Sequence, residues 1–317
     1  MSAHALLSQV KQISSVENRD AFKECIANCY TWMKTMYNGA ENVVNLVEGR
    51  AAFVDVLLCH IWRLLEIDQH PTISLIAVGG YGRGHLQPYS DIDLLILSKR
   101  PLNKEQQELV QQFITLLWDI GLDIGQSVRT IDGTFSLANK DITIATNLIE
   151  SRLLIGNEEN FTALQDKVHG KKFWSSKDFF LAKYEEQQNR QAKFNGTNYN
   201  LEPNIKENPG CLRDIQTIGW VAKKHFRVFK GKSLIEHGYF TQEELDELME
   251  CRKHLWCIRF TLHFHTGRNE NRLLFDYQAD IARKLGYTDP TDPDNDKRAV
   301  EMMMKELFRI IRRVSEL

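Results

Sequence analysis

Two aspartates, Asp91 and Asp93, are the residues of this sequence whose spacing is best suited to chemistry. On an extended strand, residues two positions apart point to the same side. Two carboxylates held side by side raise each other's pKa unless a cation lies between them. Mg²⁺ or Mn²⁺ prefers such oxygen ligands and keeps positions for phosphate oxygens. The pair therefore predicts a divalent-metal site suited to phosphoryl-type transfer.

A glycine-rich segment precedes the aspartates, and Gly79 and Gly80 end an apolar run over residues 73–78 that predicts a buried strand. Because glycine has no side chain, we expect these backbone N–H groups to approach a triphosphate closely. We expect Ser90 to add a hydroxyl donor and Arg83 to neutralise phosphate charge. The segment lacks the Gly-Lys-Ser/Thr of a Walker A loop and is not a GxGxxG before a helix. It predicts a different kind of triphosphate site.

The elements that position these residues form a compact α/β unit, with strands predicted over 73–78, 91–97 and 122–130 and a helix over about 103–119. Further helices are predicted over residues 4–35, 41–67, 143–154, 179–191, 212–229, 242–264 and 298–317. The predicted fold class is α+β, a small mixed-sheet core flanked by helices and followed by a mostly α-helical domain. The predicted domains are an N-terminal helical segment (1–70), the core (71–160) and a helical domain (161–317).

A third carboxylate is expected on a neighbouring strand, and Asp123 is our candidate because it lies near the start of the third predicted strand. It would bind metal or accept the proton of the acceptor group, although a surface aspartate at a strand end explains it equally well. Asp141 is the rival candidate, but its place just before a helix favours an N-cap. Arg129, in the third strand, either faces the site or forms a structural ion pair.

Cations near the turn at Pro209 and Gly210 are weaker candidates for binding the nucleotide. Lys206 and Arg213 either reach over the nucleotide or, with Asp214, cap the helix that follows. Both readings stay open from the residues alone.

Composition is that of an ordinary soluble protein, with 317 residues, 43% apolar and 26% charged. The net charge of −2 gives no general attraction to nucleic acid or to a membrane, so we expect neither as a partner. No apolar run reaches the roughly 20 residues of a membrane span, and no signal peptide is recognised, which predicts a cytoplasmic protein. The six cysteines form no CxxC pair and are expected to be free thiols.

The combination of Gly-Gly, a ten-residue loop and Asp-x-Asp resembles the DNA polymerase β nucleotidyltransferase superfamily. Longer stretches resemble one family within it, the bacterial PII uridylyltransferase, also called the uridylyl-removing enzyme. These stretches are AVGGYGRGHLQPYSDIDLLIL (77–97), LWDIGLDIGQSVRT (117–130), DITIATNLIESRLLIG (141–156), GTNYNLEP (196–203), KENPGCLRDIQT (206–217) and NRLLF (271–275).

The resemblance implies transfer of a uridylyl group from UTP to a tyrosine hydroxyl of the PII signal protein, with release of pyrophosphate and a need for Mg²⁺ or Mn²⁺. It assigns the triphosphate to Gly79 and Gly80 and the metal to Asp91 and Asp93, and it expects the region after about residue 160 to close over the nucleotide. Whole family members also carry an HD phosphohydrolase domain and paired ACT domains, which are too large for this chain. We therefore expect part of a longer protein, able to transfer but not to remove the group.

Two other functions stay open. Adenylyl transfer from ATP to glutamine synthetase is one, because that family resembles this chain at Gly-Gly/Asp-x-Asp and Leu-Arg-Asp, although its third strand looks different. A catalytically silent nucleotide-binding module is the other, and the intact Asp91 and Asp93 argue against it. One departure from the family is Cys211, which stands where a second glycine is usual and matters only if its backbone needs a positive φ.

Overall fold

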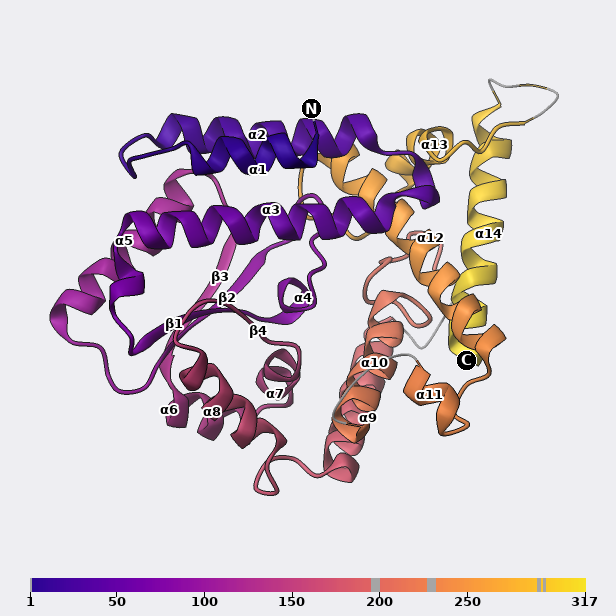
Figure 1. Cartoon of the computed structure of the whole chain (residues 1–317). Coiled ribbons are helices and arrows are strands. Elements are labelled where there is room, and N and C mark those ends of the chain that lie inside the picture. The colour runs from indigo at the N-terminus through magenta and orange to yellow at the C-terminus, as the bar shows by residue number, and fades with distance from the viewer. Residues whose placement is uncertain (1, 195–199, 227–231, 290–291, 293–294) are drawn as a thin grey trace. The chain divides into compact units, whose positions relative to one another are not determined.

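The protein consists of two compact units in a computed structural model that describes residues 2–194, 200–226, 232–289, 292 and 295–317 (Figure 1). The first unit comprises Met1–Tyr37 and Asn45–Phe173, and the second comprises Asn38–Val44 and Trp174–Leu317. The first two helices and the strands lie in the first of these units. Each unit is described by itself below.

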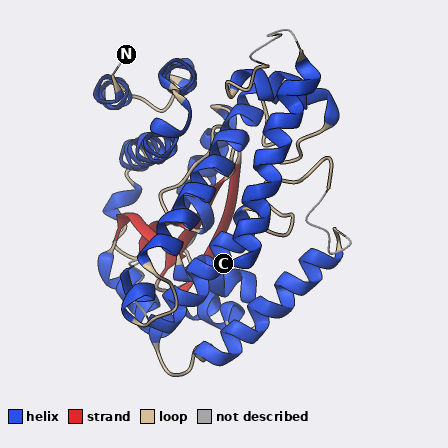
Figure 2. Ribbon diagram, turned by 90° about the vertical axis from the view of Figure 1, so that its right-hand side faces the viewer, coloured by secondary structure: helices blue, strands red, loops and turns tan. Residues whose placement is uncertain are grey.

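A four-stranded mixed sheet forms the centre of the first unit and appears in red in Figure 2. Its strands are β1 (Ile73–Ala77), β2 (Ile92–Ser98), β3 (Ile124–Thr130) and β4 (Arg152–Gly156). Their order is β3-β2-β1-β4, with β2 parallel to β3 and β1 antiparallel to both β2 and β4. The sheet and its surrounding helices confirm the predicted α+β class, and β1 to β3 lie where strands were predicted.

Helices enclose this sheet, and Figure 1 shows α3 on one side and α6 to α8 on the other. The helices of the first unit are α1 (Ala3–Lys11), α2 (Arg19–Met36), α3 (Val43–Leu64), α4 (Gly79–Gly82), α5 (Lys104–Asp119), α6 (Ile131–Ala138), α7 (Ile142–Ile149) and α8 (Glu158–His169). Trp62 of α3 meets Phe113 of α5 edge-on, with ring centroids 5.0 Å apart and both rings fully buried. Such aromatic pairs contribute strongly to a core because they bury large apolar areas.

Two helix predictions were wrong in extent. The helix predicted over 143–154 ends at Ile149, and residues 152–154 belong to β4. A turn closed by the Ser151 N–H and hydroxyl, both donating to the Leu148 carbonyl, separates the two elements. The apolar run hides this break because a buried helix and a buried strand have similar composition. The region predicted over 4–35 is two helices separated by residues 12–18.

The second unit is helical, as predicted for the C-terminal region. Its helices are α9 (Ser176–Ala192), α10 (Leu212–Phe226), α11 (Lys232–Glu236), α12 (Gln242–Thr266), α13 (Phe275–Lys284) and α14 (Asp296–Glu316). α14 packs on α12 and α13 through an apolar face that includes the buried Met303, Leu307 and Ile311. Residues 195–199 of the loop that resembles the family and 227–229 of a predicted helix lie outside the described residues.

Among the described helices, none combines the length and the apolar character that crossing a membrane requires.

Candidate active site

The Asp93 carboxylate lies beside the turn formed by residues 79–82, called the glycine turn below, because β1 and β2 are antiparallel neighbours. The N–H of Val78, just beyond β1, donates to the Asp93 carbonyl at 3.0 Å. Gly79 follows with φ of +58°, a conformation that favours glycine, and begins α4. A Cβ atom placed on Gly79 would lie 2.9 Å from Oδ2 of Asp93. The turn therefore needs glycine both for its backbone shape and for the space that Asp93 occupies.

Gly125 borders the same carboxylate from β3, which lies on the other side of β2 from β1. It pairs with Asp93 in the parallel register of β2 and β3. A Cβ atom at this position would lie 2.6 Å from Oδ1 of Asp93, closer than real carbon atoms come. The Asp93 carboxylate is thus enclosed between two glycines, Gly79 on one side and Gly125 on the other.

The predicted third carboxylate, Asp123, is exposed directly before β3, and its carbonyl accepts a hydrogen bond from Ile92 N–H at 2.9 Å. Asp123 precedes Gly125 by two positions, as Asp91 precedes Asp93, and each of the two lies directly before its strand. Within the described part of the chain, no group of three or more His, Cys, Asp or Glu side chains could hold a metal by itself. The oxygen donors fit an ion such as Mg²⁺, which completes its coordination with water or substrate.

Asp141, the rival candidate, is the N-cap of α7. Its carboxylate accepts hydrogen bonds from the N–H groups of Thr143 at 2.7 Å and Ile144 at 3.1 Å. These N–H groups have no carbonyl partner within the helix, so the cap stabilises its first turn. The capping interpretation of Asp141 is confirmed.

Arg83, predicted to neutralise phosphate charge, forms an ion pair with Glu150 in this structure. Glu150 is buried and caps the end of α7. The backbones of α4 and α7 also come very close here, since a Cβ atom on Gly82 would lie 2.3 Å from the Glu150 carbonyl oxygen. The glycine turn is therefore fixed against α7.

A second set of contacts holds the glycine turn to α3 and β4. The buried Tyr81 hydroxyl donates to Asp55 of α3 at 2.6 Å. Arg152 of β4 donates to both oxygens of the same carboxylate, at 2.7 and 3.0 Å. Burial, reinforced by the neighbouring Asp55, raises the pKa of Tyr81 well above its ordinary value. Tyr81 therefore stays a hydrogen-bond donor across the physiological pH range.

The loop that leads to the aspartate pair is held by α2 and α3. The buried guanidinium of Arg50 donates to the carbonyl oxygens of Gln87 at 2.7 Å and Ser90 at 3.3 Å. Tyr30 of α2 stacks on Tyr89 of the loop, with ring centroids 4.9 Å apart. Ser90, predicted to contact phosphate through its hydroxyl, is thus anchored by its carbonyl group.

Arg129 lies on β3 at a distance from the aspartate pair. It pairs with Leu97, whereas Gly125 pairs with Asp93. Four residues of strand correspond to about 13 Å. Its carbonyl accepts a hydrogen bond from Ser98 at 3.5 Å.

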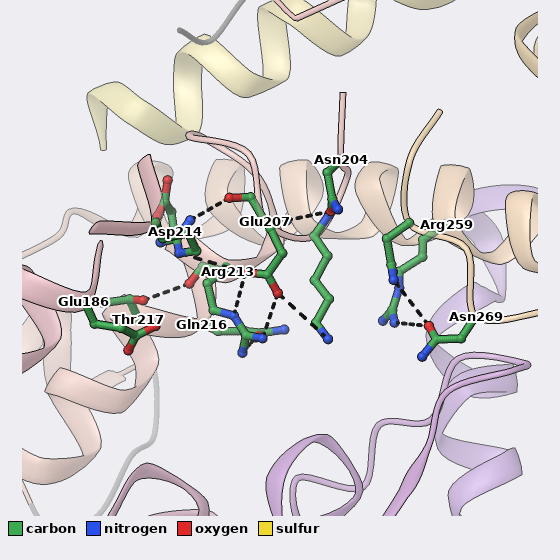
Figure 3. A network of polar contacts seen from close by, with 12 residues as sticks. Glu186, Asn204, Glu207, Arg213, Asp214, Gln216, Thr217, Arg259 and Asn269 are labelled. Atoms are coloured by element: carbon green, nitrogen blue, oxygen red, sulfur yellow. Dashed lines mark hydrogen bonds and ion pairs between the residues drawn. The ribbon is translucent and has the colours of Figure 1, made fainter. Parts of the chain in front are cut away.

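Lys206 and Arg213 lie in the second unit. Figure 3 shows the polar network there, which includes Glu207 and Arg213. Arg213 donates to Glu207 at 2.9 Å, and the Lys206 ammonium is 3.9 Å from the same carboxylate. Asp214 forms a buried ion pair with Arg190 at 2.6 Å and accepts from Gly210 N–H at the same distance. The structure brings Lys206 and Arg213 together on one carboxylate, and Asp214 anchors the turn that precedes α10.

Burial raises the pKa of the Glu207 carboxyl group, but hydrogen bonding and ion pairing with Arg213 outweigh burial, so this pKa lies below its ordinary value of 4.5.

The backbone at Cys211 has an ordinary conformation. Gly210 has φ of +73°, whereas Cys211, at the position where the family usually has glycine, has no positive φ. The departure at Cys211 therefore causes no backbone strain.

Sequence reasoning missed several residues that shape this site, namely Arg50, Asp55, Gly125 and Arg152. An isolated glycine in a strand pattern, such as Gly125, is a signal of close backbone approach. Arg50 and Asp55 interrupt an otherwise apolar stretch of α3, which is a weaker signal. For Arg152 the sequence gives no signal, because its partner Asp55 is 97 positions away.

Comparisons with known proteins identify two matching families and several similar enzymes. The family described as "Nucleotidyltransferase domain" matches residues 60–143, and that described as "GlnD PII-uridylyltransferase" matches residues 178–317. A bifunctional uridylyltransferase/uridylyl-removing enzyme of Pseudoalteromonas translucida is 49% identical over 99% of this chain and 35% of its own length. Enzymes of the same name from Photobacterium profundum (49%, covering 87% and 31%) and Vibrio cholerae (44%, covering 94% and 33%) are similar.

The strands β1, β2 and β3 and the glycine turn lie within the residues that match the nucleotidyltransferase domain family. The resemblance to the PII uridylyltransferase family is confirmed along nearly the whole chain. The chain spans about a third of the length of these curated relatives.

Proposed function

We propose that this chain transfers UMP from UTP to a tyrosine hydroxyl of a PII signal protein and releases pyrophosphate, in the cytoplasm. The observation that carries the proposal is the Asp93 carboxylate enclosed between Gly79 and Gly125, on a chain closely similar to uridylyltransferases. An enclosed carboxylate keeps its position through the reaction, as transfer requires.

In this proposal, Asp91 and Asp93 hold a divalent ion, Mg²⁺ or Mn²⁺, which neutralises negative charge on the α-phosphate when it is bound. The backbone N–H groups of Gly79 and Gly80 bind the triphosphate. They begin the helical turn of α4, so the helix itself offers them no carbonyl partner. The Ser90 hydroxyl adds a further donor.

The transfer step forms a bond between the tyrosine oxygen and the α-phosphorus and breaks the bond from that phosphorus to pyrophosphate. Asp123 accepts the hydroxyl proton in this proposal or serves as a further metal ligand. Its exposed position directly before β3, two residues ahead of Gly125, supports either role.

Arg83, Arg129, Lys206 and Arg213 remain proposed nucleotide contacts. Arg83 already pairs with Glu150, so binding a phosphate means sharing or leaving that partner. Lys206 and Arg213 share Glu207 in the same way.

Adenylyl transfer from ATP to glutamine synthetase is the alternative reaction, and a silent nucleotide-binding module is the alternative from another class. The similarity to relatives named as uridylyltransferases favours UTP.

Intact-mass analysis of PII tests the proposal. The purified chain is incubated with Mg²⁺, PII, 2-oxoglutarate and ATP, with labelled UTP or labelled ATP supplied separately. A uridylyl mass added only from UTP, and lost with Asp93→Asn, is expected. Adenylyl addition to glutamine synthetase, offered with ATP in a parallel incubation, supports the alternative reaction, and UTP binding without any transfer supports the silent module.

A further inference from the structure

The side chain of Asn147, on α7, borders the glycine turn at the point where Asp93 does. A Cβ atom on Gly79 would lie 2.9 Å from Oδ2 of Asp93 and 3.5 Å from Oδ1 of Asn147. Both side chains therefore end beside the first residue of the turn. The sequence alone assigns no role to Asn147.

The face of α7 that carries Asn147 is fixed against α4. Residues three positions apart lie on one face of a helix, which places Asn147 beside Glu150. Glu150 meets the other end of the turn, through its ion pair with Arg83 and through the close approach of its carbonyl to Gly82. Asp141 fixes the first turn of the same helix. The helix backbone that carries Asn147 is thus fixed at both of its ends.

The Asn147 amide is available for a ligand. It is half-buried, and no described residue forms a hydrogen bond with its side chain. An asparagine side chain carries two N–H donors beside its oxygen. A polar group that is partly withdrawn from water and has no protein partner is well suited to bind a substrate, because little has to be broken first.

We propose that Asn147 is a nucleotide-binding residue whose side-chain amide donates a hydrogen bond to a phosphate oxygen of the bound nucleoside triphosphate. The proposal rests on the proposed function, which places the triphosphate at Gly79 and Gly80. It adds a neutral donor from α7 to the donors of the turn. A neutral amide adds no charge beside the Asp93 carboxylate.

Titration calorimetry with UTP and Mg²⁺, repeated with ATP, tests this proposal on the full chain. Hydrogen bonds to charged groups contribute enough to binding that Asn147→Ala is expected to weaken UTP binding about 10-fold. Asn147→Asp keeps the size but replaces the donor with a negative charge, so it is expected to weaken binding further. Asn139→Ala is the matched control, because Asn139 is also half-buried and without a side-chain hydrogen bond to any described residue.

The outcomes separate the two proposals. Unchanged UTP binding by Asn147→Ala would overturn the role of Asn147 while leaving the uridylyltransferase proposal intact. Equal or tighter binding by Asn147→Asp would also overturn it, because a metal ligand would then explain the residue better. Preferential binding of ATP, weakened equally by Asn147→Ala, would support the role of Asn147 in nucleotide binding. It would contradict the proposal that UTP is the substrate. A wild-type chain that binds neither nucleotide would overturn both.

Thermal unfolding of the three variants completes the test. Alanine favours a helix more than asparagine does, so Asn147→Ala is expected to unfold at the wild-type temperature or above it. Weaker binding by a variant that keeps its stability then reports the lost contact.

Discussion

Asp93 and Gly125 face each other across two parallel strands, and the carboxylate of the first fills the space that a side chain on the second would need. The distance from Oδ1 of Asp93 to a Cβ atom placed at Gly125 is only 2.6 Å. A carboxylate can rotate away from a new methyl group at small cost, whereas two packed strands cannot separate easily. A side chain at residue 125 should therefore displace the carboxylate and leave the sheet in place.

Gly125→Ala is accordingly expected to abolish most transfer with little change in the free energy of unfolding. A displacement of about 1 Å in a reacting group can cost about 100-fold in rate, which sets the expected loss in kcat. Rates of PII modification and urea unfolding curves measure the two effects. Gly219→Ala, a helix position with no atom within 4 Å of the added carbon, is the control and should retain full activity. Wild-type kcat in Gly125→Ala would refute the enclosed-carboxylate interpretation.

Replacing Asp91, Asp93 or Asp123 by asparagine is expected to affect transfer differently from the same replacement at Asp141. Asp93→Asn and Asp91→Asn should remove transfer, and Asp123→Asn should reduce it if Asp123 is the third carboxylate. Asp141→Asn should change neither activity nor stability much, because asparagine caps a helix about as well as aspartate does. Single-turnover rates with labelled UTP distinguish these variants. Loss of transfer in Asp141→Asn alone would reverse the assignment of the third carboxylate.

Arg50 is expected to affect kcat because it holds the loop that precedes Asp91. Lysine presents one compact charge instead of a planar fork, so Arg50→Lys should fail to hold both the Gln87 and Ser90 carbonyls. Asp91 follows Ser90 directly, and we expect kcat to fall about 10-fold while KM for UTP changes less. Steady-state kinetics give both values. A variant with lower stability but wild-type kcat would limit Arg50 to a structural role.

The hydrogen bond between Tyr81 and Asp55 is expected to contribute modestly to stability. Tyr81→Phe removes one donor while Asp55 keeps its contacts with Arg152, so a loss of about 1 kcal/mol in the free energy of unfolding is expected. Asp55→Ala should cost about 2 kcal/mol, because it leaves the buried Tyr81 hydroxyl without its partner. Denaturant unfolding measures both. A larger loss in Tyr81→Phe than in Asp55→Ala would contradict this ranking.

Glu207 is expected to make the second unit sensitive to acid. Its pKa in the folded protein lies below the ordinary 4.5, so the folded state binds the proton less readily than the unfolded state does. The stabilisation is present above pH 4.5 and is lost as the pH falls through the lower, folded value. Glu207→Gln should therefore be less stable than wild type at pH 6, and the difference should shrink below pH 4.5. A difference that stays constant down to pH 3 would point to a cause other than charge.

The strands β1, β2 and β3 could be predicted from the sequence because glycines and prolines lie near their ends. The boundary between α7 and β4 could not, because the residues on both sides of it are almost uniformly apolar and carry no period that separates them. Asp141 was interpreted correctly as a cap since that role depends only on its own neighbours.

The supports of the site escaped prediction for a different reason. Asp55 and Arg152 are 97 positions apart, and Arg50 and Gln87 are 37 apart. Their pairing depends on how the chain folds back on itself, which local spacing does not encode. The spacing of Lys206 and Arg213 likewise did not predict that both would form ion pairs with Glu207.

The anchoring of the Asp91 loop on α2 and α3 bears on how this domain can be exchanged between proteins. Its recognisable motifs fall within 71–160, but Tyr30 and Arg50, which shape the loop, lie well upstream. A recombination event that moved only residues 71–160 into a relative would bring the aspartates without the supports to which they are matched. The smallest segment that keeps these supports with the aspartates therefore begins before Tyr30. We expect the residues of α2 and α3 that contact the loop to change in evolution together with it.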